Sequence, residues 1–504
     1  MKKFTKLCSL TMAGAMALSL AACGSKPAAS SAATAEGSTS TAASTGTAAG
    51  DITTLKIITV GNGMPTNYDA WAKQVNDYLG EKIGVNVSVE VVSWGDWDQR
   101  RNVIVNTSGD YDIMFTNSNT YSNDVTTGAF MDITELLPTV APDLYAMLPE
   151  DYWDACRING QIYAVPTYKD SSQSEFIVWD KDAADATGID VSKINTLEGL
   201  TEPLQKITDE KGEAAFPLNK SGANYLGFEY DMMNAGLIAM GVRYDDTEAK
   251  VVPVYEQEDV MSRLKLFHQW YQSGIINSDA ATKPEENAYK ACNIAQGWAG
   301  AAETTWGPNM GVTAVAYKWG PTIVSNDTVR GSLNCISSNC KAPEKALEFL
   351  QTLNTDPYTR DLFYYGVDGD NWQYSDDTKT KVHKNNSDWT MAGYTQASFF
   401  TVTPTDDVEF NQWDEVKELN EGAEPSVLIG FTLNTKDFSD QLANCISIAE
   451  RYKGEILTGT SDPETAVPAL MAELRAAGFD DIQAAAQEQV DAFMATKATT
   501  ESAK

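Results

Sequence analysis

The stretch from Leu55 to Trp94, LKIITVGNGMPTNYDAWAKQVNDYLGEKIGVNVSVEVVSW, decides the fold. It opens with LKIITVG, a short apolar run that predicts a buried strand. The segment NYDAWAKQVNDYLGEKIG predicts a helix, because its apolar residues recur every three to four positions and Thr66 or Asn67 can cap its start. Valines then alternate with other residues in VNVSVEVVSW, a pattern that is typical of a second strand.

The next segments continue this alternation of strands and helices. RRNVIVNTSGD predicts a short helix and YDIMFT predicts another apolar strand. Strand, helix, strand, helix, strand is the pattern of an α/β sheet, in which ligands bind beyond the carboxyl ends of the strands. The three predicted tips there are GNGMPT, SWGDWD and TNSNTYSN, which are polar, amide-rich or aromatic. We therefore expect ligand-binding groups on these tips.

The first fifty residues predict a location and not an activity. A positive start followed by an apolar run marks residues 1–22 as a secretory signal peptide. It ends in Leu-Ala-Ala-Cys, which resembles the lipobox of bacterial lipoproteins and implies a lipid on Cys23; an ordinary signal peptide with a chance cysteine is the alternative. Residues 23–50 then predict a flexible tether, because Gly, Ser, Thr and Ala dominate them. We expect a lipid-anchored protein on the extracellular face of the bacterial cytoplasmic membrane.

Composition limits what the body of the chain can be. From Asp51 onward it is too long for one hydrophobic core, so we expect two domains. Hydrophobic residues make up 43% of the chain and aromatic residues 10%, as in globular proteins. The formal net charge is -33, with 70 acidic against 37 basic residues. This charge argues against nucleic acid as a partner and favours an acidic, soluble exterior.

Cysteine and histidine offer little chemistry. Five cysteines follow Cys23 without a C-x-x-C pair, so we expect small buried thiols, although Cys335 and Cys340 could pair across CISSNC. His268 lies in a helix-like segment and His383 in a polar one, and neither has the neighbours that a catalytic triad or a zinc site requires. The chain also contains no Walker A, G-x-S-x-G or H-E-x-x-H motif. We expect no catalytic residues, no metal and no cofactor.

A series of longer blocks, in a fixed order, covers nearly everything after the tether. The blocks are GDYDIMFT, GAFMDITELLP, LPEDYWDACRINGQIYAVPTYKD, VWDKD, LKLFHQWYQSGIINSDAAT, AAETTW, CKAPEKALEFLQTLNTDPYTRDLFYYGV, PSVLIGFTLNTKDFSDQLANCISIAERY and LTGTSDPETAVPALMAELRAAGFDDIQAAAQEQVDAF. In these blocks the chain resembles the extracellular family 1 solute-binding lipoproteins of ABC importers, in the branch that ends in a DUF3502 domain. The resemblance implies a bilobal, type II periplasmic-binding-protein-like fold, with two α/β lobes joined by a hinge. It also implies a monomer that closes on a small-molecule ligand and delivers it to an ABC permease.

The resemblance further implies three crossings between the lobes. We expect them at AVPTYKDSS, near AYKWGPTIV and around YYGVDGDNW. Lobe one is then expected to hold residues 51–168 plus 320–366, and lobe two residues 169–319 plus 367–495. The DUF3502-like part is expected over about 367–495.

The aromatic content favours a sugar ligand. A pyranose has apolar faces that stack on aromatic rings and hydroxyls that require amides and carboxylates. We expect Trp306 to line the cleft, because the resemblance places AAETTWG at its edge, and Glu303, one helical turn earlier, to accept hydroxyl hydrogen bonds. The further aromatic candidates are Trp298 and Trp389 in the second lobe and Trp94 in the first. Each of these tryptophans has ordinary packing as its alternative.

Polar candidates lie after the predicted strands and at the first crossing. Amides and hydroxyls both donate and accept hydrogen bonds, although the same residues also cap turns. Those after strands are Asn62, Thr116, Asn117 and Asn119. The first crossing contributes Tyr168, Lys169 and Asp170, of which the last two are also suited to a simple ion pair.

Two other functions stay open at this point. A surface glycoside hydrolase needs two carboxylates and no histidine, so composition does not exclude it. A lipoprotein that senses its ligand and signals to a partner would share the fold, and permease genes next to its own would favour import instead. The ligand itself stays undetermined among mono-, oligo- and acidic saccharides and peptides.

Overall fold

The computed structural model describes residues 52–107 and 110–501. The predicted signal peptide, Cys23 and the tether lie outside the described residues. The described residues belong to one compact unit. None of the helices in this part of the chain combines the length and the apolar character that crossing a membrane requires.

The opening stretch forms the first sheet, as its pattern predicts. The strand order is β2-β1-β3-β13-β6, in which β1 lies parallel to β2 and β3 while β13 runs antiparallel to β3 and β6. The strands are β1 Thr53–Gly61, β2 Val85–Ser93, β3 Ile113–Thr116, β6 Val165–Pro166 and β13 Leu333–Ile336. Alternate valines of β2 are buried, so this strand has one face in the core. Because β1, β2 and β3 are parallel, the segments that follow these three strands lie at the same edge of the sheet.

Helices cover this sheet. In α1 (Tyr68–Ile83) the side chains of Trp71, Val75 and Leu79 are fully buried and lie one turn apart, so one stripe of the helix packs inward. Asn67 is the N-cap residue, but its amide donates to Asp370 and Asn371 instead of capping the helix. The other helices on this side are α2 Trp97–Asn106, α3 Ser118–Thr126, α4 Leu137–Val140, α5 Pro142–Met147, α6 Glu150–Ala155, α11 Asn326–Val329, α12 Pro343–Thr355 and α13 Pro357–Tyr365.

A second sheet begins where the chain leaves the first. Its order is β11-β7-β12-β16, and a bulge between Trp319 and Thr322 interrupts the pairing of β12 with β7. The strands are β7 Gln173–Asp180, β11 Cys292–Gln296, β12 Ala314–Val324 and β16 Glu424–Pro425. Three antiparallel strands form a smaller sheet: β8 Tyr230–Asp231, β9 Met240–Arg243 and β10 Val251–Pro253. Two short hairpins are β4 Arg157–Ile158 with β5 Gln161–Ile162, and β14 Trp372–Tyr374 with β15 Val382–Lys384.

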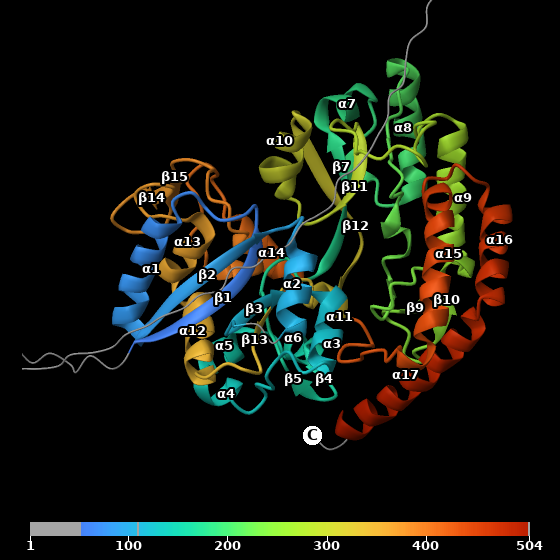
Figure 1. The fold of residues 1–504 in the computed structure, drawn as a ribbon. Helices are drawn as coiled ribbons and strands as arrows, with labels where there is room; N and C mark the ends of the chain where they lie inside the picture. Colours follow the sequence, from blue (N-terminus) through green and yellow to red (C-terminus); the bar gives the residue numbers. More distant parts are fainter. Residues whose placement is uncertain (1–51, 108–109, 502–504) are drawn as a thin grey trace, which may run out of the picture. The chain divides into compact units, whose positions relative to one another are not determined.

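The remaining helices come from the middle and the end of the chain. They are α7 Lys181–Ala186, α8 Leu197–Lys211, α9 Glu258–Gln272, α10 Gly307–Met310, α14 Gln412–Glu421, α15 Ser439–Leu457, α16 Pro463–Ala476 and α17 Phe479–Glu501. In Figure 1 the last three, in red, lie beside α9 and β10, and their contacts agree. His268 lies on α9, as its helical spacing predicts.

Two separate hydrophobic cores give the bilobal fold. The first takes buried residues from Leu55 to Tyr168 and the second from Ile177 to Ile323. The first core resumes at Val324 and extends to Val402, with Ile429 as a later member, and the second resumes at Leu428.

The third change of core differs from the expected boundary at 366. Residues 367–402 were expected in the second lobe, but buried side chains of this segment, among them Val367, Trp372 and Met391, belong to the first core. The hairpin β14–β15 turns the chain back, and the Trp372 indole donates to Gly366 O. We propose that the third crossing lies between Val402 and Leu428. No periodic pattern in the sequence marks this boundary.

Candidate functional site

A cavity of about 550 Å³ lies beside the first crossing and is lined by segments that adjoin the two cores. Its walls come from the first crossing, β7, the segment 216–225, β11 with the residues before it, and α11. They are formed by Lys169, Asp170, Ser172, Gln173, Glu175, Phe216, Pro217, Leu218, Asn219, Ser221, Gly222, Asn224, Tyr225, Glu286, Asn287, Lys290, Asn293, Ile294, Gln296, Asp327, Thr328 and Gly331. Amide and charged side chains dominate this wall, which suits a polar ligand more than an apolar one.

Two carboxyl groups on this wall are withdrawn from water. Glu175 on β7 is 2% exposed, and burial raises its pKa to about 7, although Gln173 donates to it over 2.9 Å and opposes the rise. Asp327 on α11 is half-buried, and its pKa is also raised to about 7 because of burial and the negative charge of Asp231. Both groups are therefore partly protonated near neutral pH and can then donate as well as accept hydrogen bonds.

Three buried polar atoms of the wall have no hydrogen-bond partner among the described residues. They are Tyr225 Oη, Asn293 Oδ1 and Asp327 Oδ1. Buried polar atoms are normally paired, and leaving one unpaired costs about 1–3 kcal/mol. All three can accept a hydrogen bond, so a ligand that carries several hydroxyl donors would complete this wall.

The predicted hinge residues have different positions. Lys169 and Asp170 line the cavity and form an ion pair at 2.7 Å with both side chains mostly buried. The two residues therefore form an ion pair and line the cavity at the same time. Tyr168 does not line the cavity: it is 5% exposed and packs between Tyr152 and Phe400 in the first core.

Trp306 lies beside a second hollow, of about 470 Å³, that shares Glu286, Asn287, Lys290, Asn293 and Ile294 with the first. It ends a π-helical turn, Ala302–Trp306, and its ring contacts Phe176 with the centroids 6.1 Å apart. Glu303 on the same turn is exposed and lies outside the residues that line either hollow.

The candidates on the strand tips meet at one edge of the first sheet. Asn62 and Asn119 are exposed, and Asn117 is half-buried, caps α3 and accepts from the Asn119 backbone N–H. Thr116 is fully buried and hydrogen-bonded to Thr120, so its hydroxyl serves the fold. Trp94 is also exposed on this edge. None of these five residues is among the described residues that line the 550 Å³ cavity.

Two other tryptophans have packing roles. Trp389 was expected in the second lobe, but it packs on Trp71 in the first core and its indole N–H donates to Phe363 O. Trp298 is half-buried and packs against Trp413 in a small cluster beside α14. Indole rings bury a large apolar area, so these positions stabilise the fold.

Several wall residues escaped the sequence reading. The segment 216–225, FPLNKSGANY, contributes Asn219, Ser221 and Asn224, and β11 contributes Asn293. An amide-rich run is the same signal as in the three strand tips, but no short-range pattern shows that this run, which follows α8, lines a cavity.

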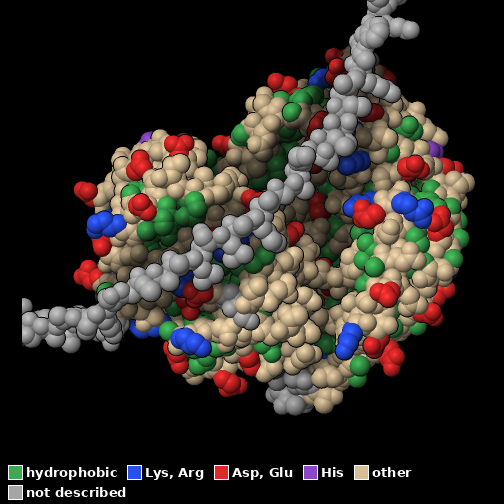
Figure 2. All heavy atoms as spheres, in the orientation of Figure 1, with side chains coloured by type: hydrophobic (Ala, Val, Ile, Leu, Met, Phe, Trp, Pro, Cys, Tyr) green, Lys and Arg blue, Asp and Glu red, His purple; other side chains and the backbone are tan. Residues whose placement is uncertain are grey.

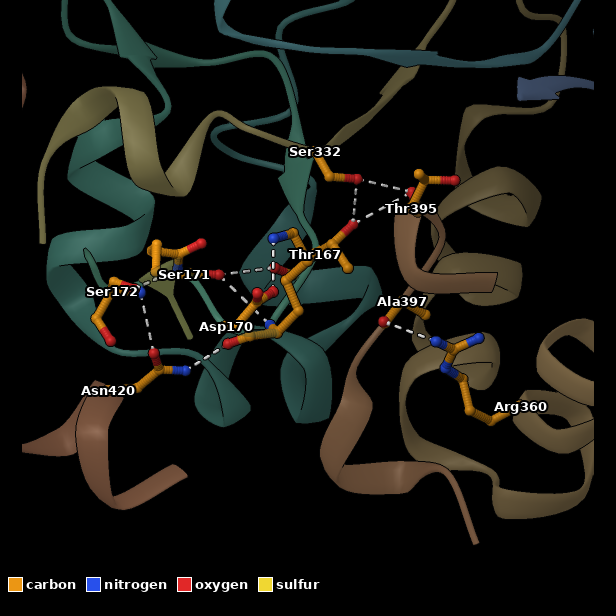
Figure 3. Close-up of polar contacts among 11 residues, drawn as sticks. Thr167, Asp170, Ser171, Ser172, Ser332, Arg360, Thr395, Ala397 and Asn420 are labelled. Atoms are coloured by element: carbon orange, nitrogen blue, oxygen red, sulfur yellow. Dashed lines mark hydrogen bonds and ion pairs between the residues drawn. The ribbon is translucent and has the colours of Figure 1, made fainter. Parts of the chain in front are cut away.

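Two residues of the cavity wall, Lys169 and Ser172, belong to a hydrogen-bonded junction of chain segments (Figure 3). The Ser332 hydroxyl lies 3.0 Å from the Thr167 hydroxyl and donates to Thr395 O, also over 3.0 Å. Asn420 accepts from the Ser172 N–H over 3.1 Å and donates to Lys169 O. Small hydroxyl and amide side chains thus join the first crossing to segments more than a hundred residues away.

The face drawn in Figure 2 has no large patch of one charge. Figure 2 shows acidic side chains spread over the face it presents, without a basic patch. Within the described residues no group of three or more His, Cys, Asp or Glu side chains comes together in a metal-binding arrangement. All five cysteines of this part are buried and free.

Two lobes around a polar cavity at their crossing define the class of solute-binding proteins. Comparison with known families agrees: residues 73–369 match the model of the bacterial extracellular solute-binding proteins, and residues 427–495 match DUF3502. The chain belongs to the bacterial extracellular solute-binding protein family. The resemblance read from the sequence is thereby confirmed.

The relatives are similar over nearly the whole chain. A carbohydrate ABC transporter substrate-binding protein of Streptococcus pneumoniae serotype 4 is 28% identical over 96% of this chain and 97% of its own. The crystal structure of the N-glycan transport solute-binding protein NgtS from Streptococcus pneumoniae is 26% identical, covers 88% of this chain and 100% of its own, and superposes with a TM-score of 0.80. Complexes of NgtS with Man1GlcNAc and Man5GlcNAc cover 88% of this chain and 99% of their own at the same identity, with TM-scores of 0.70 and 0.67.

Proposed function

We propose that this protein is a lipid-anchored extracellular binding protein that captures an oligosaccharide between its lobes and delivers it to an ABC importer. The observation that carries the proposal is the polar cavity at the crossing, whose wall holds unpaired acceptors at Tyr225, Asn293 and Asp327. Sugar hydroxyls supply the donors that these atoms lack. The carbohydrate-binding relatives support the same ligand class.

Closure of the lobes is the proposed mechanism. The walls come from segments attached to both cores, so a ligand would gain contacts as they approach and shift the population toward the closed form. The structure superposes better on NgtS described without a glycan than on its two glycan complexes. This difference supports an open form that closes on its ligand.

Binding without turnover is part of the proposal. Both histidines are engaged elsewhere: His268 with Gly459 O and His383 with Asp406. The relatives matched are solute-binding proteins, which supports a binding role. The glycan recovered after incubation should therefore be intact.

A glycan array followed by thermal-shift and calorimetric titration tests the ligand class, with Man1GlcNAc and Man5GlcNAc included among the probes. We expect a glycan to raise Tm, because a ligand that binds only the native state stabilises it by mass action. X-ray scattering should then show a smaller radius of gyration in the complex. An array on which no glycan binds, while a peptide library yields a ligand, would contradict the proposal.

The anchor and the importer need their own tests. Cys23→Ser should release the protein from the membrane fraction, whereas unchanged membrane association would contradict the lipid anchor. Deleting the gene should abolish uptake of the bound glycan by the cells, and a chain carrying Cys23→Ser should restore uptake poorly. Uptake that continues without the protein would favour a sensing role.

A further inference from the structure

Two large aromatic side chains are exposed side by side at the carboxyl edge of the first sheet. Trp94 is 42% exposed and Tyr394 is 46% exposed. Their rings are nearly parallel, with an interplanar angle of 14° and centroids 6.3 Å apart, which is the range of offset stacking. We call this pair the aromatic shelf.

Both rings of the shelf stand on rigid supports. The Trp94 backbone N–H donates to Gly61 O over 3.2 Å, and its ring meets the buried Phe115 edge-on with centroids 6.0 Å apart. The buried Arg360 guanidinium donates to Gly393 O over 2.8 Å, directly before Tyr394. The shelf is therefore preorganised, so binding to it would require little ordering of side chains.

The order of strands relates the shelf to the cavity. Trp94 of the shelf follows β2, Asn62 follows β1, Asn119 lies after β3, and Gly331 of the cavity wall lies just before β13. Because β13 is antiparallel to β3, with Leu333 opposite Thr116, these four positions share one edge of the sheet. Three strand spacings of about 4.8 Å separate β2 from β13, so the edge spans about 14 Å.

The edge between the shelf and the cavity is polar. The exposed amides of Asn62 and Asn119 lie between the two, where they can pair with hydroxyls. An exposed apolar pair at one end of a polar sheet edge suits a ligand with alternating requirements: hydroxyls along its rim and an apolar ring face at its end. A chain of sugar rings has this chemistry.

We propose that the aromatic shelf of Trp94 and Tyr394 is an outer subsite for a distal sugar ring of the glycan whose other end occupies the cavity. This inference rests on the proposed function and deepens it: the ligand is an extended oligosaccharide, longer than a disaccharide. The cavity selects by hydrogen bonds and the shelf adds affinity by stacking.

The test compares short and long glycans on matched variants. Trp94→Ala and Tyr394→Ala are titrated with Man1GlcNAc and Man5GlcNAc, together with the shortest and longest further binders from a glycan array. Tyr145→Ala is the control, because Tyr145 is 37% exposed and packs on Trp153 instead of lying at the sheet edge. Thermal melts of each variant without glycan report on the fold.

We expect each shelf variant to weaken the longer glycan by about 10-fold and the shorter by less than about 2-fold, as for a peripheral aromatic contact. Trp94→Phe should restore most of the loss, and Tyr145→Ala should change neither affinity. Equal losses for short and long glycans, or no loss for the long one, would overturn the shelf while leaving the proposed function intact. A wild type that binds no glycan on the array would overturn both.

Discussion

The cavity and the aromatic shelf expose two different kinds of surface along one sheet edge. The cavity wall is buried and polar, with acceptors at Asn293 and Asp327 that have no partner in the described protein. The shelf is open and apolar, and Trp94 and Tyr394 already contact each other. A ligand that fails to pair with the cavity leaves buried acceptors unsatisfied, whereas one that misses the shelf loses only stacking.

This difference separates specificity from affinity. Buried unpaired groups reject a ligand that lacks a donor at the right place, because desolvation of the acceptor is not repaid. An exposed ring accepts any apolar face of suitable size. We therefore expect substitutions in the cavity to change which glycans bind, and substitutions on the shelf to change how much a longer chain gains.

The largest effect is expected from Asn293→Leu, which keeps the side chain's size but removes its hydrogen-bonding atoms. Affinity should fall by about 2 kcal/mol, roughly 30-fold, for short and long glycans alike. The free protein should not lose stability, because the variant removes a buried acceptor without a partner. Calorimetry and chemical unfolding measure the two quantities.

Asn385→Leu is the control for this substitution, since Asn385 is exposed after β15. An Asn293→Leu protein that binds normally but unfolds more easily would show that Asn293 serves the fold and not the cavity.

A smaller effect is expected from Asn420→Ala, behind the cavity wall. Its amide joins Lys169 O and the Ser172 N–H, so the variant loses two hydrogen bonds to the crossing. The free energy of unfolding should fall by about 1–2 kcal/mol. Glycan affinity should fall by the same factor for every chain length, because Asn420 supports the cavity wall and not the shelf.

Asn420→Asp keeps the acceptor for Ser172 and should lose less stability than Asn420→Ala in the same denaturant titration. A loss of affinity confined to long glycans would break the distinction between cavity and shelf.

A further effect concerns pH and Glu175. Its pKa is raised from 4.5 to about 7 in the folded protein, so the folded state holds a proton that the unfolded state has released. This group's contribution to stability is present below about pH 4.5 and is lost as the pH rises to about 7. Glu175→Gln should remove that part of the pH dependence in melts recorded from about pH 4.5 to 8.

Glu303→Gln is the matched control, because Glu303 is an exposed carboxylate. It should leave the pH dependence of Tm unchanged. Identical pH profiles for the wild type and Glu175→Gln would show that Glu175 is not buried as an acid, and the polar account of the cavity would need revision.

Local patterns predicted the first sheet well. The spacing of Trp71, Val75 and Leu79 predicted α1, and the alternate valines predicted β2, because each pattern reports which face of one element is buried. The strand tips followed from chain direction alone. The family followed from long blocks in a fixed order and is confirmed by the match over residues 73–369.

Long-range packing set the limit of prediction. Trp389 and Trp306 look alike in sequence, yet the first packs on Trp71 and the second lies beside a hollow. The two tryptophans differ in the residues that contact them in the folded chain, and Trp71, which contacts Trp389, is hundreds of residues away in the sequence. Asn293 could not be predicted as a cavity residue for the same reason, because the segments that form the cavity wall meet only in the folded chain.

The five buried cysteines of the described residues make this protein well suited to fluorescent labelling. Burial raises the pKa of the Cys156 thiol to about 12 and that of Cys340 to about 11, so these groups stay protonated and shielded from maleimides. In a chain with Cys8 and Cys23 changed to serine, a single cysteine introduced at exposed Asn119 would be the reactive thiol. A dye placed there, on the sheet edge, would report glycan binding as a change in emission.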